Sequence, residues 1–144
     1  MESSIEKRVR DSFDRQTAMK MIGASITRIE QGEVTIELPF RSDFTQQHGF
    51  IHAGVVSMIV DTACGYAALT RMPESTTVLS AEYKVNFLSP AEGEKLIARG
   101  RVIKPGHTFT VCYGEVYAQK DGIEKLVATM MATMIAREKT GLED

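Results

Sequence analysis

A single carboxylate, Asp61, lies in a stretch of chain that is otherwise almost entirely apolar. Residues 49–70 contain Asp61 and one histidine, His52, and their other side chains are apolar, small or hydroxylic. A carboxylate is costly to bury unless it is paired, hydrogen-bonded or used in a reaction. It can act as a general base or as a nucleophile. Asp61 is therefore the first candidate catalytic residue, and a hydrogen-bonded structural carboxylate is the alternative.

The residues around Asp61 predict one long helix over residues 51–70. Bulky apolar side chains recur there at helical spacing, and small residues fill most of the other faces. A helix of this kind must be wrapped by the rest of the protein. The run also resembles a membrane span, but an Asp at the bilayer centre would cost about 3 kcal/mol. The amphipathic strands that follow also need a core of their own, so we expect no membrane partner.

The rest of the chain predicts an N-terminal helical segment, residues 1–22, and six strands. An amphipathic helix is expected over residues 3–21, and the polar residues 137–144 are expected to form a loose tail. Gly, Pro and Asp turns separate the expected strands, which span residues 24–31, 33–40, 76–88, 94–104, 107–119 and 124–136. Tight links between successive strands indicate an antiparallel meander.

These elements predict a single α+β domain over residues 1–144. One long helix can cover one face of a sheet of about six strands, so the sheet should curl around it. The open face or edge that remains invites a second copy of the chain, which predicts a homo-oligomer, either a dimer or a dimer of dimers. The net charge of −2, without a basic patch, argues against a nucleic-acid partner. The charged N-terminus lacks an apolar signal core, and Cys64 and Cys112 belong to no C-x-x-C pair, so we expect reduced thiols and a cytoplasmic location.

Residues 20–136 resemble the hotdog fold and, within it, the acyl-CoA thioesterases of the phenylacetate-pathway type. The family signature is Asn or Gln, then Gly, then His-Gly-Gly at the start of the central helix, then an acidic residue two turns later. In this chain the signature reads Gln46, Gly49, His52-Ala53-Gly54 and Asp61. Ala53 departs from the pattern, and Gln46 replaces the Asn that is commonest beside Asp. Since Gln is more familiar from relatives that use Glu and cleave aryl thioesters, aliphatic and aryl acyl groups both stay open.

The resemblance implies hydrolysis of an acyl-CoA or aryl-CoA thioester, with CoA as part of the substrate and no separate cofactor. Asp61 would activate water or attack the carbonyl carbon. Gln46 would orient the thioester or the water. Ser80, in the strand after the helix, would hold Asp61 or the water by a hydrogen bond. His52 is more suited to fixing the turn into the helix than to transferring protons.

The first turn of the long helix offers an oxyanion site. Free backbone N–H groups and the positive end of the helix dipole lie there. They can stabilise the negative charge that develops on a thioester carbonyl oxygen. Small residues let a substrate approach closely, so the candidate donors are the N–H of Ala53 and, as a second donor, that of Gly54.

Helix geometry keeps these donors apart from Asp61 within one chain. Ala53 and Asp61 are eight residues apart, or about 12 Å along the axis, and His52 and Asp61 point about 180° apart. A symmetric dimer with antiparallel helices resolves this, because Asp61 of one subunit then meets Ala53 of the other. The resemblance implies such composite sites, with Gln46, His52, Ala53 and Gly54 from one subunit and Asp61 and Ser80 from its partner.

The turn that contains Lys104, Gly106 and His107 is a candidate contact for the CoA phosphates, and an ordinary solvated turn is the favoured alternative. The three histidines lack metal-ligand spacing, so no metal site is expected.

Two other functions stay open: a hydratase or dehydratase of acyl thioesters, and a non-catalytic acyl-CoA-binding protein. The expected proline-rich loop of the hydratases is missing, and the acidic residue at position 61 favours the enzyme over the binder.

Overall fold

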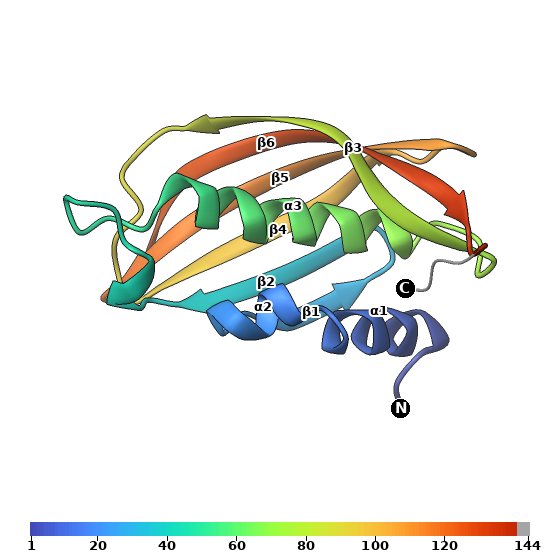
Figure 1. Ribbon diagram of the computed structural model, residues 1–144, viewed down its shortest axis with the longest axis horizontal. Helices are drawn as coiled ribbons and strands as arrows, with labels where there is room; N and C mark the ends of the chain where they lie inside the picture. The colour runs from blue at the N-terminus through green and yellow to red at the C-terminus, as the bar shows by residue number, and fades with distance from the viewer. Residues whose placement is uncertain (141–144) are drawn as a thin grey trace.

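One long helix lies in the concave face of a curled antiparallel sheet (Figure 1). The computed structural model describes residues 1–140. The elements are two short helices, α1 (Ser4–Asp14) and α2 (Thr17–Ile22), strands β1 (Ser25–Glu30) and β2 (Glu33–Pro39), a 3-10 turn η1 (Ser42–Phe44), the long helix α3 (Ala53–Leu69), and strands β3 (Thr76–Phe87), β4 (Lys95–Lys104), β5 (Phe109–Lys120) and β6 (Ile123–Glu138). The predicted hotdog fold is therefore confirmed. No helix among residues 1–140 combines the length and apolarity that a membrane crossing needs.

The sheet order is β1-β2-β4-β5-β6-β3, and every neighbouring pair is antiparallel. The predicted meander holds for β4, β5 and β6. It is wrong for β3, which pairs with β6 and forms the edge of the sheet opposite β1. The connection at residues 88–94 carries the chain from that edge past the start of α3 to the middle of the sheet (Figure 1). A short turn constrains two strands to be neighbours, whereas this longer connection does not.

Two glycines let α3 lie directly on the sheet. Gly100 of β4 and Gly114 of β5 are register partners beneath the helix. A Cβ on Gly100 would lie 2.5 Å from the carbonyl carbon of Ala63, and one on Gly114 would lie 2.4 Å from Cγ2 of Val60. Side chains at these two positions would push the helix away from the sheet, and the sequence pattern did not reveal this contact.

One side of α3 is left open by its own chain. The positions that stay exposed or half-buried follow helical spacing and include Gly54, Met58, Asp61, Thr62 and Gly65. The other sides of the helix are buried against the sheet and the N-terminal segment. The expectation that the whole helix is wrapped is therefore only partly met, because no element among residues 1–140 covers this stripe.

The N-terminal segment forms two helices instead of the one predicted over residues 3–21. The chain leaves the helix at Arg15 and takes an extended conformation at Gln16 before α2 begins. In one continuous helix, Phe13 and Met19 would point about 120° apart. The break lets both side chains enter the core, where both are buried.

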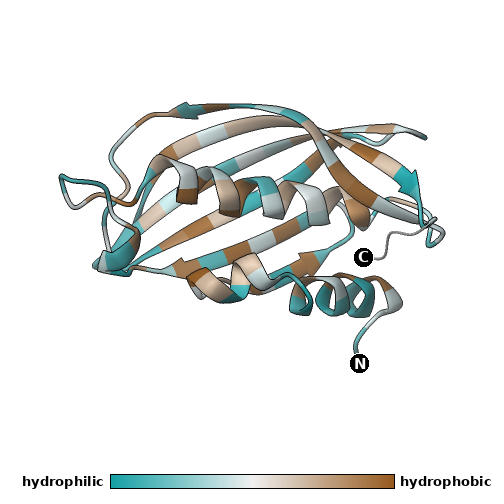
Figure 2. Cartoon of the chain, viewed as in Figure 1, coloured by the Kyte–Doolittle hydropathy of each residue, from teal (hydrophilic) through white to brown (hydrophobic). Residues whose placement is uncertain are grey.

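The strand pattern read from the sequence agrees with the structure apart from the strand ends. Hydrophobic and hydrophilic bands alternate along the strands in Figure 2. β5 begins at Phe109, so His107 lies in the preceding turn. β6 continues to Glu138, so the first two residues of the predicted tail pair with β3. The tail's last four residues, 141–144, lie outside the described residues.

Candidate active site

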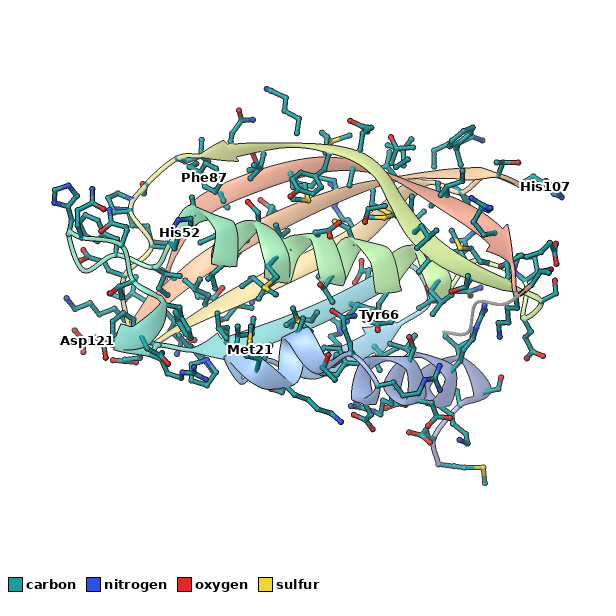
Figure 3. All side chains as sticks on the ribbon, viewed as in Figure 1. Met21, His52, Tyr66, Phe87, His107 and Asp121 are labelled. Atoms are coloured by element: carbon teal, nitrogen blue, oxygen red, sulfur yellow. The ribbon has the colours of Figure 1, made fainter. Side chains whose placement is uncertain are left out.

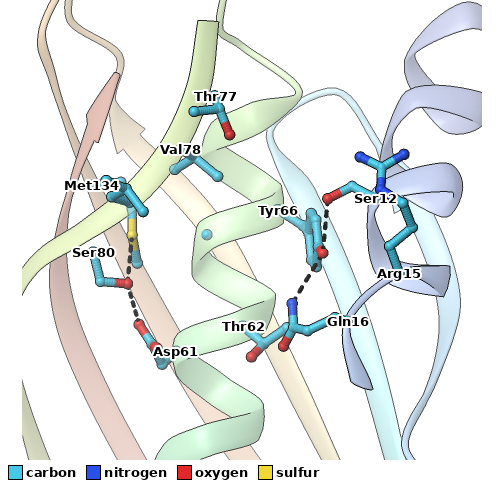
Figure 4. Close-up of a pocket in the computed structure, with 12 residues that line it drawn as sticks. Ser12, Arg15, Gln16, Asp61, Thr62, Tyr66, Thr77, Val78, Ser80 and Met134 are labelled. Atoms are coloured by element: carbon cyan, nitrogen blue, oxygen red, sulfur yellow. Dashed lines mark hydrogen bonds between the residues drawn. The ribbon is translucent and has the colours of Figure 1, made fainter. Parts of the chain in front are cut away.

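Asp61 lies on the open stripe of α3, in reach of the edge strand β3. The Ser80 hydroxyl donates a hydrogen bond of 2.7 Å to Oδ1 of Asp61 (Figure 4). The same hydroxyl oxygen lies 3.4 Å from the sulfur of Met134 in β6. A bulge in β3 directly follows Ser80, and bulges commonly re-aim side chains beside active sites. The structure thus brings together the two residues that were expected to act as a pair.

Partial burial raises the affinity of this carboxylate for protons. Burial raises the pKa of Asp61 above its ordinary value, and the hydrogen bond from Ser80 opposes that shift because it favours the ionised form. Within residues 1–140, no Lys, Arg or His side chain forms an ion pair with Asp61. A carboxylate with a raised pKa is a stronger general base, which suits proton abstraction from water.

Among residues 1–140, the first turn of α3 has one backbone amide without an acceptor. His52 is the N-cap residue, and its Nδ1 accepts a hydrogen bond of 2.8 Å from the Gly54 N–H. The Gly54 amide is therefore occupied, and its role as a second oxyanion donor is not supported. A Cβ at Gly54 would lie 2.9 Å from the same nitrogen, so the glycine makes room for the His52 ring. The Ala53 N–H donates no hydrogen bond within residues 1–140 and remains available as a donor.

Gln46 organises the loop that precedes α3. Its side-chain oxygen accepts hydrogen bonds from the backbone N–H groups of His48, at 2.5 Å, and Phe50, at 3.3 Å. The side-chain nitrogen of Gln46 donates no hydrogen bond within the described part of the chain. Gln46 therefore holds its own loop through the oxygen while its nitrogen is available to an acceptor such as a carbonyl oxygen.

Two cavities divide the predicted site residues between them. A cavity of about 490 Å³ contains Asp61 and Ser80 in its walls. A second cavity, of about 370 Å³, is lined by Gln46 and Ala53 together with Phe87 and other apolar side chains. The two cavities share no lining residue. A single chain therefore does not gather the oxyanion donor and the carboxylate at one place.

The predicted CoA-binding turn lies far from the start of α3. His107 and His52 are at opposite ends of the molecule in Figure 3. Lys104, Gly106 and His107 are all exposed. The Gly106 N–H approaches the Thr110 hydroxyl oxygen at 3.5 Å, which holds the turn closed.

The buried thiols do not offer an alternative nucleophile. Cys64 and Cys112 are unbridged and fully buried, and the Cys112 thiol donates to the carbonyl oxygen of Cys64 at 3.5 Å. Burial raises the pKa of both thiols, that of Cys112 to about 12, so both stay protonated near neutral pH. Among residues 1–140, no three His, Cys, Asp or Glu side chains gather as a metal site would require.

Sequence reasoning missed the contribution of the N-terminal segment to the Asp61 cavity. Ser12, Arg15 and Gln16 line that cavity from the junction of α1 and α2. The Tyr66 hydroxyl of α3 lies 3.0 Å from Oγ of Ser12 and accepts a hydrogen bond of 3.0 Å from Nε2 of Gln16. These contacts join residues about fifty positions apart, and no local pattern in the sequence signals them.

Comparison with known proteins identifies relatives of this chain. The family model of the thioesterase superfamily matches residues 48–125. A solved thioesterase family protein from Silicibacter pomeroyi is 49% identical, with a TM-score of 0.92 over 94% of this chain and 99% of that one. The Escherichia coli PaaI protein, from the phenylacetic acid degradation operon, shares the fold at 19% identity, with a TM-score of 0.84 over 92% and 93% of the two chains. A candidate esterase of Saccharolobus solfataricus is 29% identical over 64% of this chain, a match that spans 65% of that relative's length.

Proposed function

The chain belongs to the thioesterase superfamily, and we propose that it hydrolyses acyl-CoA or aryl-CoA thioesters to a free acid and a thiol with Asp61 as the catalytic carboxylate. The observation that supports this most directly is the Asp61–Ser80 pair at the edge of a large cavity. Ser80 binds one carboxylate oxygen of Asp61 and leaves the other oxygen for water or for the substrate.

Two routes use this carboxylate. As a general base, Asp61 takes a proton from water while the water oxygen attacks the thioester carbon, and collapse of the intermediate releases the thiolate, which then takes up the proton. As a nucleophile, Asp61 attacks the same carbon and forms a mixed anhydride with loss of the thiolate, and water then cleaves the anhydride. In both routes the carbonyl oxygen gains negative charge and needs a hydrogen-bond donor.

We assign that donor to the Ala53 N–H of a second copy of the chain. The separation of the two cavities supports this assignment, because neither cavity alone contains both Asp61 and the first turn of α3. The open stripe of α3 supports it too, since a partner helix can approach along small residues such as Gly54 and Gly65. In such a homodimer the partner's first helical turn and Gln46 complete the site around Asp61, twice per dimer.

The edge strand β3 supplies a surface for the same dimer. Its outer backbone groups have no strand partner within residues 1–140, and an unpaired edge is a template for pairing with another chain. Three large apolar side chains on β3 are about half exposed in the single chain: Leu79 at 44%, Tyr83 at 44% and Phe87 at 49%. Burial of these side chains would favour association.

The CoA moiety would extend from the site toward the turn of Lys104, Gly106 and His107. That turn lies at the same end of the molecule as the C-terminal part of α3 (Figure 3). It offers a lysine charge and exposed backbone to an anionic group. No separate cofactor is needed, because a carboxylate and water suffice for the hydrolysis.

Asp61→Asn tests the proposed function. The substitution keeps the size and the hydrogen bond from Ser80 but removes the base, so thiol release from acyl-CoA should fall by about 10²–10⁴-fold. The measurement is release of free thiol across acyl-CoAs and aryl-CoAs. Asp121→Asn, in the β5–β6 turn, is the matched control and should leave the rate unchanged. Equal rates for wild type and Asp61→Asn would refute the assignment, and binding of CoA esters without thiol release by the wild type would indicate the non-catalytic binding protein.

A further inference from the structure

We propose that the sulfur of Met134 is a second acceptor for the Ser80 hydroxyl, which makes Met134 a positioning residue for the Asp61 carboxylate. While Asp61 is ionised, the hydroxyl donates to the carboxylate. When Asp61 is protonated, the hydroxyl turns to the sulfur. This inference rests on the proposed function and deepens its general-base route, in which Asp61 takes up and releases a proton.

Met134 faces Ser80 across two paired strands. The two residues are register partners in β6 and β3, so their side chains leave the sheet on the same face. β6 is paired on both sides, with β3 and with β5, and the Met134 side chain is fully buried. Packing therefore holds the sulfur in the wall of the Asp61 cavity, beside the Ser80 hydroxyl.

The Ser80 hydroxyl has one hydrogen and two acceptors within reach. Its oxygen lies 2.7 Å from Oδ1 of Asp61 and 3.4 Å from Sδ of Met134 (Figure 4). Within residues 1–140, no other acceptor is hydrogen-bonded to this hydroxyl. Since one hydrogen does not serve both acceptors fully, the stronger acceptor takes it.

The charge of Asp61 decides which acceptor is the stronger. An ionised carboxylate oxygen is a strong acceptor and a thioether sulfur is a weak one, so the Ser80 hydrogen points to Asp61 while that residue is ionised. Protonation of the carboxyl weakens Oδ1 as an acceptor or makes it a donor to the Ser80 oxygen. The Ser80 hydrogen then turns to the Met134 sulfur, and no proton leaves Ser80. The sulfur therefore favours the protonated acid.

Water and two other hydroxyls are the alternatives to this sulfur. Ser80 is exposed in the single chain, where water reaches it, but the proposed partner helix would cover the open stripe and exclude that water. Thr62 and Thr77 also line the cavity. The Thr62 hydroxyl donates to the carbonyl oxygen of Met58, and within residues 1–140 neither threonine hydroxyl is hydrogen-bonded to Ser80. In the proposed dimer, the sulfur is thus the acceptor that remains.

The titratable groups around Asp61 come from several elements. Arg15 lines the cavity from the junction of α1 and α2, and Tyr66 lines it from α3. Cys64 of α3 interacts electrostatically with Asp61. β3 and β6 line the cavity without an acidic or basic side chain, and the proposed dimer would add His52 of the second copy. The variants compared below keep all of these groups, so a difference between them reports on Ser80 and the sulfur.

Met134→Leu tests the role of the sulfur in the full chain, because leucine is similar in size and offers no acceptor. The acidic limb of the pH profile of kcat/KM should move to lower pH by about 0.5 pH unit, as expected for the loss of one weak hydrogen bond to the protonated form. Met130→Leu is the matched control and should leave the limb in place. Met130 is also buried in β6, but its register partner in β3 is Val85.

The double variant Ser80→Ala/Met134→Leu separates this role from packing. Without the Ser80 hydroxyl, the sulfur has no hydrogen to accept, so Met134→Leu should then move the limb no further. Equal shifts by Met134→Leu in the presence and absence of the hydroxyl would refute the proposal. A Met134→Leu profile that coincides with that of Met130→Leu would refute it too. Met134→Ile, which suits a strand, takes the place of Met134→Leu if the latter does not fold.

A carbon-13 NMR titration of the Asp61 carboxyl measures the same shift without catalysis, and Asp61→Asn identifies its signal. The midpoint should fall in Met134→Leu and stay in place in Met130→Leu. A wild type that releases no thiol from acyl-CoAs or aryl-CoAs would refute the proposed function, and the NMR midpoints would still decide on Met134. An active enzyme whose midpoint does not respond to Met134→Leu would leave that function intact and refute this inference.

Discussion

At the scale of single residues, Asp61 and Ser80 set the expected pH dependence. Because burial raises the pKa of Asp61, the acidic limb of the pH profile of kcat/KM should have its midpoint above pH 3.8, the ordinary pKa of an aspartate. Activity should rise with pH through that limb as the carboxylate ionises. Ser80→Ala removes the hydrogen bond that lowers this pKa, so the limb should move to higher pH.

The measurement is a pH–rate profile of kcat/KM for the wild type and Ser80→Ala. Ser75→Ala removes a hydroxyl from the exposed loop before β3 and serves as the control, with an unchanged profile. A downward shift in Ser80→Ala would show that Ser80 favours the protonated acid, contrary to the donor geometry.

The stability of folding should respond to Asp61 in the opposite direction. A folded-state pKa above the unfolded value means that the ionised carboxylate disfavours the folded state. The contribution of Asp61 to the free energy of unfolding is therefore fully present below its pKa in the unfolded state. It is lost as the pH rises through its pKa in the folded state. The free energy of unfolding of Asp61→Asn should exceed that of the wild type at neutral pH, and the difference should vanish in acid.

At the scale of elements, the contact between α3 and the sheet depends on Gly100. A Cβ there would overlap the helix backbone at Ala63, which cannot move as a side-chain end can. Gly100→Ala should therefore lower the free energy of unfolding by about 1–3 kcal/mol. Gly65→Ala is the matched control, because its Cβ meets an ordinary contact, and it should not be destabilised. Urea unfolding at one fixed protein concentration measures both, and equal stabilities would refute the close approach of helix and sheet.

The Arg8 side chain helps to hold the N-terminal helices to the end of α3. The Arg8 guanidinium donates hydrogen bonds to the carbonyl oxygens of Leu69, Met72, Pro73 and Thr76. Carbonyls at a helix C-terminus lack partners within the helix, and a cation is favoured there. This contact fixes α1 beside the Asp61 cavity, and so an element outside the family signature shapes the site.

At the scale of the whole molecule, the central expectation is a site shared by two chains. Ala53→Pro removes the expected oxyanion N–H, and proline is tolerated at the first position of a helix. His52, with φ −55° and ψ 134°, already lies near the polyproline II conformation that a residue before proline prefers. Ala53→Pro should therefore fold and lose about 10²–10³-fold in kcat.

A mixture of Asp61→Asn and Ala53→Pro chains tests whether the site is shared. In a mixed dimer, one site receives both substitutions and the other receives neither. Random pairing of equal amounts should restore about a quarter of wild-type activity, because half of the dimers then carry one intact site. The control mixes each variant with itself and should show no restoration. Absence of restoration in dimers shown to be mixed, or full activity in a monomer, would place the whole site within one chain.

The sequence by itself determined the features that depend on neighbouring residues. Helical spacing predicted α3 and the position of Asp61 in it, alternation and turn residues predicted the strands, and the signature from Gln46 to Asp61 indicated the family. These inferences succeed because secondary structure and helix caps follow from contacts between residues a few positions apart.

The tertiary structure alone decided which distant segments meet. It placed β3 beside β6 at the edge of the sheet, showed that Gly54 donates to His52, and brought Ser12 and Gln16 to Tyr66 beside Asp61. These outcomes depend on pairings and contacts across tens of residues, which local periodicity does not encode. For that reason the position of the candidate carboxylate Asp61 was predictable from the sequence, whereas the walls of the cavity that surrounds it were not.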